Sequence, residues 1–147
     1  MRPNHIDFLK KAHAWLEYDN KLFVHGGINP QLELKQHSLE FLTWDRTLVE
    51  NAWFLSRQNL NVKVSSFDEI YVGHTTTQWF IQNKKSNLTP QEVLQLSTQP
   101  LFLGNVIMLD TGAGWSGKLT IMDIVTHQYW QSDLTPQLYG IEGRKNY

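Results

Sequence analysis

The chain has 147 residues, enough for one domain with its own hydrophobic core. Hydrophobic residues make up 41% of it and charged residues 18%, a balance typical of globular rather than disordered proteins. The 13 basic residues nearly offset 14 acidic ones, which argues against a nucleic-acid-binding surface. The absence of cysteine excludes a disulfide framework, a cysteine-ligated metal site and a thiol nucleophile.

Neither a signal peptide nor a membrane-spanning helix is expected. Residues 1–11 contain no long apolar run, and no later stretch approaches the roughly 20 apolar residues of a spanning helix. These features and the lack of cysteine predict a cytoplasmic protein without a membrane or nucleic-acid partner. The 6 tryptophans, 5 tyrosines and 7 phenylalanines are expected to pack mainly in the core, rather than to form an exposed platform for sugars or bases.

The first half of the chain predicts helices around one strand. Asn4 suits the N-cap of a helix whose apolar stripe includes Trp15 and which fades near the turn-forming pair Asp19-Asn20. Residues 22–24 form an apolar run typical of a buried strand. Apolar residues at helical spacing over 39–58 predict one or two helices.

The middle of the chain predicts two strands and a short helix. Residues 59–64 suggest an edge strand, and residues 67–72 lead into a second strand. A polar loop over 83–87 precedes a capping box that begins at Thr89. The helix it opens should be short, because Pro100 follows soon after.

The last third predicts strands and loops. Residues 106–109 indicate a strand, and residues 111–117 a glycine-rich loop. An antiparallel pair over 118–125 and 128–132 follows. The tail 134–147 reads as loop or disorder, and the absence of repeats and linkers favours one α/β domain over 1–147.

One pattern recurs at three predicted strand ends, which lead into His25, His74 and Asp110. If the strands are parallel, these residues share one sheet edge, where α/β folds bind ligands. A strand-end histidine beside glycine suits a metal ligand, although a partly exposed imidazole without a metal is the simpler interpretation. Two histidines do not complete a catalytic metal site, and Asp110 also suits a plain turn residue.

The segment from Gly112 to Lys118 superficially resembles a phosphate-binding P-loop. Its spacing is right, but Leu119 stands where serine or threonine is required. The following residues read as a strand, whereas a P-loop must open a helix. We therefore predict that this loop is not a nucleotide site.

Four segments in order resemble those of calcineurin-like metallophosphoesterases, in the branch of bacterial serine/threonine phosphatases. Residues 23–30 (FVHGGINP) resemble the family's VHGG segment, 43–46 (TWDR) its W-x-R segment, and 72–75 (VGHT) its G-H-T segment. Residues 106–123 resemble its DTGA strand, loop and strand. The resemblance implies a four-layer α-β-β-α sandwich with mixed sheets, of which this chain is the C-terminal half.

The family's earlier motifs, G-D-x-H-G, G-D-x-x-D-R-G and G-N-H-D/E, are missing from the chain. By resemblance, His25 and His74 are ligands of one ion in a dinuclear centre of divalent metals, of which Mn, Fe and Zn are candidates. Arg46 corresponds to an arginine that contacts the substrate phosphate; without the resemblance, a surface ion pair on a helix is the favoured interpretation. Trp115 takes the place of a tyrosine beside the active site, with ordinary packing as the alternative.

The resemblance implies a phosphatase that hydrolyses phosphomonoesters, including phosphoserine or phosphothreonine, with a metal-activated water. Because several ligands are missing, we expect this chain alone to be inactive and to need an N-terminal half or self-association. The alternative is a non-catalytic binding or oligomerisation module with at most a weak two-histidine metal site.

Overall fold

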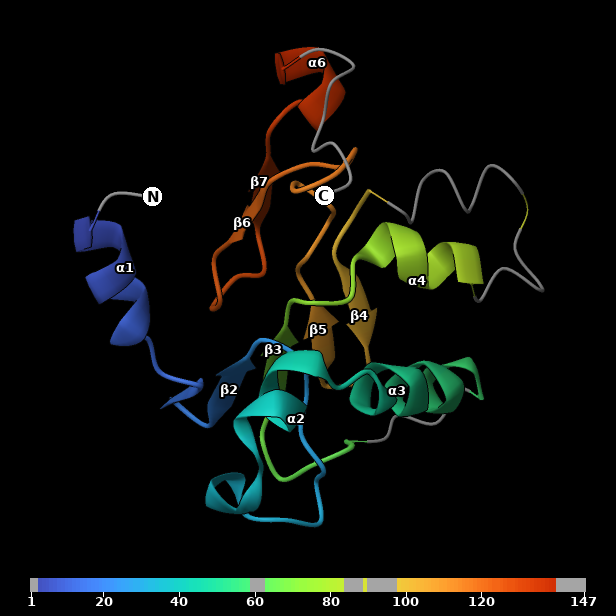
Figure 1. The fold of residues 1–147 in the computed structure, drawn as a ribbon. Helices are drawn as coiled ribbons and strands as arrows, with labels where there is room; N and C mark the ends of the chain where they lie inside the picture. Colours follow the sequence, from blue (N-terminus) through green and yellow to red (C-terminus); the bar gives the residue numbers. More distant parts are fainter. Residues whose placement is uncertain (1–2, 59–62, 84–88, 90–97, 140–147) are drawn as a thin grey trace.

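The computed structural model describes residues 3–58, 63–83, 89 and 98–139. These residues form a mixed α/β structure around a five-stranded sheet, with the strand order β1-β2-β3-β5-β4 (Figure 1). Strands β6 and β7 form a separate antiparallel hairpin. The strand bounds are Trp15–Tyr18 (β1), Lys21–Val24 (β2), Glu69–Val72 (β3), Leu101–Leu103 (β4), Val106–Met108 (β5), Thr120–Met122 (β6) and Tyr129–Gln131 (β7).

The centre of the main sheet is parallel and its two edges are antiparallel. Strand β3 pairs in parallel with β2 on one side and with β5 on the other. Strand β1 pairs antiparallel with β2, and strand β4 pairs antiparallel with β5. Strands β1 and β4 are therefore the two edge strands of the sheet. Asp19 and Asn20 make the tight turn between β1 and β2, with φ of 49° and 55°, which short polar side chains tolerate well. The turn predicted at this pair is confirmed.

The helices are short, and those with buried residues pack on the face of the sheet that carries Leu22, Ile70 and Val106. Their bounds are Pro3–Lys10 (α1), Leu34–Gln36 (the 3-10 helix η1), Leu39–Trp44 (α2), Thr47–Arg57 (α3), Thr77–Asn83 (α4) and Thr135–Tyr139 (α6). Helix α3 contacts β4 and β5, while α1 and α6 lie at the outside of the molecule (Figure 1). None of the helices in the described ranges is both long and apolar enough to cross a membrane.

The core between these helices and the sheet is mainly aliphatic. Among the described residues that are buried in this core, Phe80 is the one large aromatic side chain. Its ring stands edge-on to that of the half-buried Trp53. Four of the six tryptophans are exposed: Trp44, Trp79, Trp115 and Trp130. The prediction that the aromatic residues pack mainly in the core is therefore wrong for the tryptophans, because the small sheet is filled by branched aliphatic side chains.

Several predicted elements are confirmed and others need correction. The strands at 22–24, 67–72 and 106–109, the two helices within 39–58 and the C-terminal hairpin are all present. The first helix is wrong at both ends. It already includes Pro3, so Asn4 lies within it and is not its N-cap. It stops at Lys10, and Trp15 lies in β1, because pairing with β2 outweighs the helical pattern. Residues 135–139 are helical where loop was predicted. Strand β4 and helix α4 were not predicted.

Other predictions lie partly or wholly outside the described residues. These are most of the edge strand at 59–64, most of the loop at 83–87, the helix opened at Thr89, and the end of the tail at 140–147.

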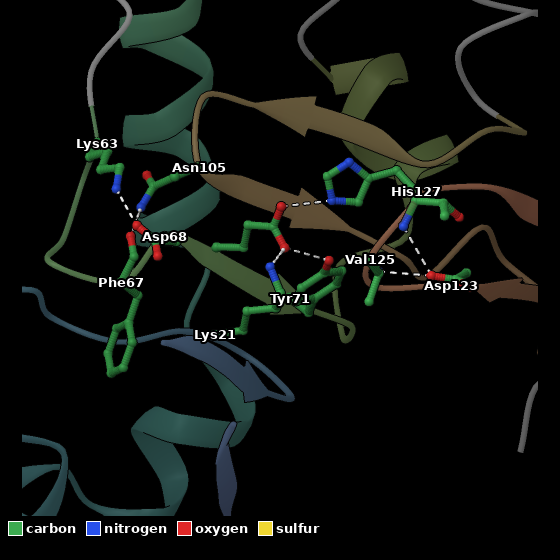
Figure 2. A network of polar contacts seen from close by, with 11 residues as sticks. Lys21, Lys63, Phe67, Asp68, Tyr71, Asn105, Asp123, Val125 and His127 are labelled. Carbon is green, nitrogen blue, oxygen red and sulfur yellow. Dashed lines mark hydrogen bonds and ion pairs between the residues drawn. The ribbon is translucent and has the colours of Figure 1, made fainter. Parts of the chain in front are cut away.

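A carboxylate network joins the C-terminal hairpin to the sheet. Lys21, Tyr71 and His127, which are labelled in Figure 2, all contact the Glu69 side chain, which is 16% exposed. Lys21 Nζ and Tyr71 Oη each donate to Glu69 Oε2 at 2.7 Å, and His127 Nε2 lies 2.7 Å from Glu69 Oε1. Burial alone would raise the pKa of Glu69, but the hydrogen bonds from Lys21 and Tyr71, together with the charge of His127, lower it. Glu69 is therefore ionised in the folded state.

We expect Glu69→Gln to lower the free energy of unfolding by about 1–3 kcal/mol, because it removes the charge that three buried or half-buried groups share. The folded-state pKa of Glu69 lies below its ordinary value of 4.5. Its contribution is therefore present above about pH 5 and is lost as the pH falls through the lower folded value. Urea unfolding at neutral pH and near pH 3 measures both effects.

The matched control is Asp133→Asn, at an exposed carboxylate. The Glu69 variant should lose less stability than the parent chain on acidification, whereas the control should follow the parent. Equal stability of the two variants at neutral pH would contradict the role of Glu69.

Candidate functional site

Three loops meet at the carboxyl edge of the parallel strands. Because β2, β3 and β5 run in the same direction, the residues that follow them, His25, His74 and Asp110, lie at one edge of the sheet. Gly73 N donates to His25 O at 3.0 Å, and Thr77 N donates to Asp110 O at 2.8 Å. The prediction that the three strand ends share one edge is confirmed, and backbone hydrogen bonds hold the loops together.

The two histidine rings lie next to each other at this edge. Their centroids are 5.3 Å apart at an interplanar angle of 61°. His25 is exposed, whereas His74 is half-buried, and its buried Nε2 has no hydrogen-bond partner within the described part of the chain. The backbone of His74 has a φ of 50°, a left-handed conformation that residues other than glycine seldom adopt. Such conformations cluster at functional sites.

The surroundings of His74 favour its neutral form. Burial lowers the pKa of His74, and the charges of Arg46 and His25 act in the same direction, while Asp110 opposes them. The imidazole is therefore mainly neutral at neutral pH. A neutral imidazole nitrogen is the form that binds a metal ion.

Asp110 serves as a turn residue. Its Oδ1 accepts a hydrogen bond from Gly112 N at 2.9 Å, as in an Asx turn. Asp110 nevertheless lines the same open depression as His25 and His74. Within the described ranges, no group of three or more His, Asp or Glu side chains is placed to hold a metal ion. The edge therefore offers two imidazoles, and the described residues do not complete a metal centre.

Arg46 is held at the junction of α2 and α3. The Asp45 carboxylate lies beside the first turn of α3 and accepts hydrogen bonds from Thr47 N and Leu48 N at 3.1 Å each. Gly26 N donates to Leu42 O at 2.7 Å, so the loop after β2 is hydrogen-bonded to α2. These contacts keep Arg46 beside the histidine loops.

The Arg46 guanidinium lies over the Trp79 ring, with Cζ 5.4 Å from the ring centroid. Its Nε is buried and has no hydrogen-bond partner among the residues that the structure describes. A buried guanidinium nitrogen without a partner leaves a donor for an anionic ligand.

Arg46 and His74 line one pocket with three tryptophans, Trp44, Trp79 and Trp115. We call it the tryptophan pocket; its volume is about 510 Å³, within the range of small-molecule sites. Three of the four predicted site residues, Arg46, His74 and Trp115, thus lie together, and His25 adjoins them through its contact with His74.

Two residues of the tryptophan pocket were missed from the sequence. Trp44 contacts the His74 ring edge-on, at a centroid distance of 4.9 Å. Its position two residues before Arg46 was the signal available. Trp79 comes from α4, a helix that was not predicted, so the sequence carried no usable signal for it.

The glycine-rich loop presents Trp115 and does not have the structure of a P-loop. It leads into strand β6 rather than a helix, as predicted. Ser116 Oγ donates to Gln78 Oε1 at 3.1 Å, which ties the loop to α4. Gly117 packs so closely that an added Cβ would lie 1.9 Å from Thr111 O. The glycines therefore serve a tight turn beside the pocket.

No family model, curated protein or solved structure matches this chain in comparisons with known proteins.

Proposed function

We propose that this chain contributes part of the active site of a metal-dependent phosphatase that hydrolyses phosphomonoesters. The observation that carries the proposal is the convergence of His25, His74 and Arg46 at the carboxyl edge of the parallel strands. It brings a two-imidazole pair together with a cation whose buried Nε has no partner in the described ranges. The resemblance of the same segments to calcineurin-like metallophosphoesterases supports it.

Each side chain has a distinct role in this proposal. His25 and His74 would hold one divalent metal ion, with Mn, Fe or Zn as candidates. Such an ion would lower the pKa of a bound water. Its positive charge would also stabilise the charge on the transferring phosphoryl group. Arg46 would hold phosphate oxygens through its guanidinium, and Trp115 would border the substrate. The remaining metal ligands would come from outside the described residues.

The proposal extends to the complete fold. In a four-layer α-β-β-α sandwich, a second sheet carrying the missing motifs would cover the sheet face opposite the helices. Leu16, Tyr18 and Phe102 are exposed apolar side chains on that face, and Phe23 stacks on Tyr71 between them. Exposed apolar residues on a sheet face favour such a partner layer.

A non-catalytic binding module is the second candidate. It is favoured by the absence, within the described ranges, of a third ligand beside the two histidines. In that case His25 and His74 would bind a metal weakly or not at all.

The deciding measurement is a Mn²⁺ titration of the isotopically labelled chain followed by NMR. We expect paramagnetic broadening of the His25 and His74 imidazole signals first. The control is His37, whose Nε2 accepts a hydrogen bond from Asn29 N at 2.8 Å and is therefore occupied. His74→Ala should abolish the selective broadening at His25, and His37→Ala should not. Equal broadening of all three histidines would contradict the metal site.

Hydrolysis of an aryl phosphate in the presence of Mn²⁺ tests the chemistry. Any turnover by this chain, or by an assembly that includes it, should depend on Mn²⁺ and disappear in His74→Ala. Turnover that survives this substitution would contradict the proposed role of the histidine pair.

A further inference from the structure

Three exposed tryptophans surround the phosphate end of the proposed site. Trp44, Trp79 and Trp115 are 63%, 44% and 51% exposed, and all three line the tryptophan pocket. They come from the end of α2, from α4 and from the loop before β6, which are far apart in the sequence. Large aromatic side chains are usually well buried, so their gathering at one exposed pocket indicates a binding surface.

Two of these rings are fixed by the polar groups that the proposed phosphate site uses. Trp79 lies under the Arg46 guanidinium at 5.4 Å, and Trp44 packs edge-on against His74 at 4.9 Å. Their orientation is therefore set before a ligand arrives. A phosphate held by Arg46 would have aromatic walls on the side where its organic group must lie.

The polar and aromatic parts of the pocket call for a ligand with two different ends. Arg46 Nε is a buried donor with no hydrogen-bond partner among the described residues, and it suits an anionic end. Indole rings bind planar aromatic groups by offset stacking and edge contacts, and gain much less from a short aliphatic chain. The remaining lining side chains, among them Thr75, Thr76 and Gln82, are polar and uncharged, so no second charge is demanded of the ligand.

We propose that the tryptophan pocket is a specificity site for phosphomonoesters of aromatic alcohols, with Arg46 binding the phosphate and Trp44, Trp79 and Trp115 enclosing the aryl group. This inference rests on the proposed function for its phosphate end. It selects aryl esters, whether free small molecules or phosphotyrosine, over the aliphatic esters of serine and threonine.

The test is ligand binding by the full 147-residue chain, which needs no turnover. The indole N–H signals of the labelled protein report on each probe: phenyl phosphate, methyl phosphate and phenol. Phenyl phosphate should bind about tenfold more tightly than methyl phosphate, which is the gain expected from one or two aromatic contacts. It should also bind more tightly than phenol, and it should shift the signals of the pocket tryptophans.

Variants separate the aryl contact from the phosphate contact. Trp79→Ala should remove most of the preference for phenyl phosphate, and Trp79→Phe should restore part of it. Trp130→Ala is the matched control, since Trp130 is a 55% exposed ring on β7 that is not part of the pocket. Arg46→Gln should weaken both phosphate esters and leave phenol unchanged. A preserved amide spectrum identifies the variants that remain folded.

The outcomes distinguish this inference from the proposed function. Equal binding of phenyl and methyl phosphate would overturn the aryl preference and leave the phosphate site intact. Binding of phenol as tightly as phenyl phosphate would overturn the phosphate role of Arg46. It would thereby also overturn the part of the proposed function on which this inference rests. A phosphotyrosyl peptide that binds more tightly than phenyl phosphate assigns a protein substrate, and equal binding assigns a small aryl ester; both support the proposal.

Discussion

Replacing Phe80 with alanine is expected to lower the free energy of unfolding by about 3–5 kcal/mol. Phe80 is fully buried, and its ring stands edge-on to Trp53 at a centroid distance of 5.5 Å. The substitution removes a large apolar contact and leaves a cavity between α4 and the core, which the surrounding helices cannot close completely. Urea unfolding followed by circular dichroism measures the change.

Phe54→Ala is the matched control, because Phe54 has the same side chain on α3 but is mostly exposed. We expect it to cost less than about 1 kcal/mol, since little apolar area leaves water when this ring is in place. A Phe80 variant as stable as the Phe54 variant would show that α4 is not docked on the core. The docking of α4 also matters for the candidate site, because α4 carries Trp79 and because Thr77 N donates a hydrogen bond to Asp110 O.

Gly26→Ala is expected to destabilise the chain by about 1–3 kcal/mol and to separate the histidine loop from Arg46. An added Cβ at Gly26 would lie 2.8 Å from three backbone atoms at the end of α2, those of Thr43, Trp44 and Asp45. Backbone cannot rotate away as a side chain can, so α2 and the loop after β2 must move apart. Both Mn²⁺ binding and phosphate binding should weaken, because they depend on elements that Gly26 holds in contact.

Gly114→Ala provides the control for this prediction. No heavy atom lies within 4 Å of a Cβ built at Gly114, and neither glycine has a positive φ that alanine would resist. The Gly114 variant should be as stable as the parent chain or slightly more stable, since alanine restricts the unfolded state. If both variants behaved alike in unfolding and in Mn²⁺ titration, the close contact at Gly26 would not be a determinant of the site.

Some of the candidate site could be read from local sequence. The runs before His25, His74 and Asp110 are apolar and end abruptly in glycine and polar residues, which identifies buried strands and their ends. Strand identity of this kind depends on a few adjacent residues. The pair Asp19-Asn20 predicted a turn for the same reason, since its backbone preference is local.

Other features depended on partners far away in the chain. Residues from Asn4 to Trp15 fit a helical pattern, but Trp15 joins a strand because β2 offers it hydrogen bonds. The exposure of Trp44, Trp79 and Trp115 follows from how much space the sheet and helices leave, which no local pattern records.

By itself, the sequence determined that this chain has short buried strands ending in two histidines and an aspartate, one or two central helices and a C-terminal hairpin. The tertiary structure alone decided that the strands are parallel neighbours, that the histidine rings meet, and that Arg46 lies among tryptophans. The physical reason is that strand formation responds to neighbouring residues, whereas pairing direction and burial are set by the free energy of contacts between distant segments.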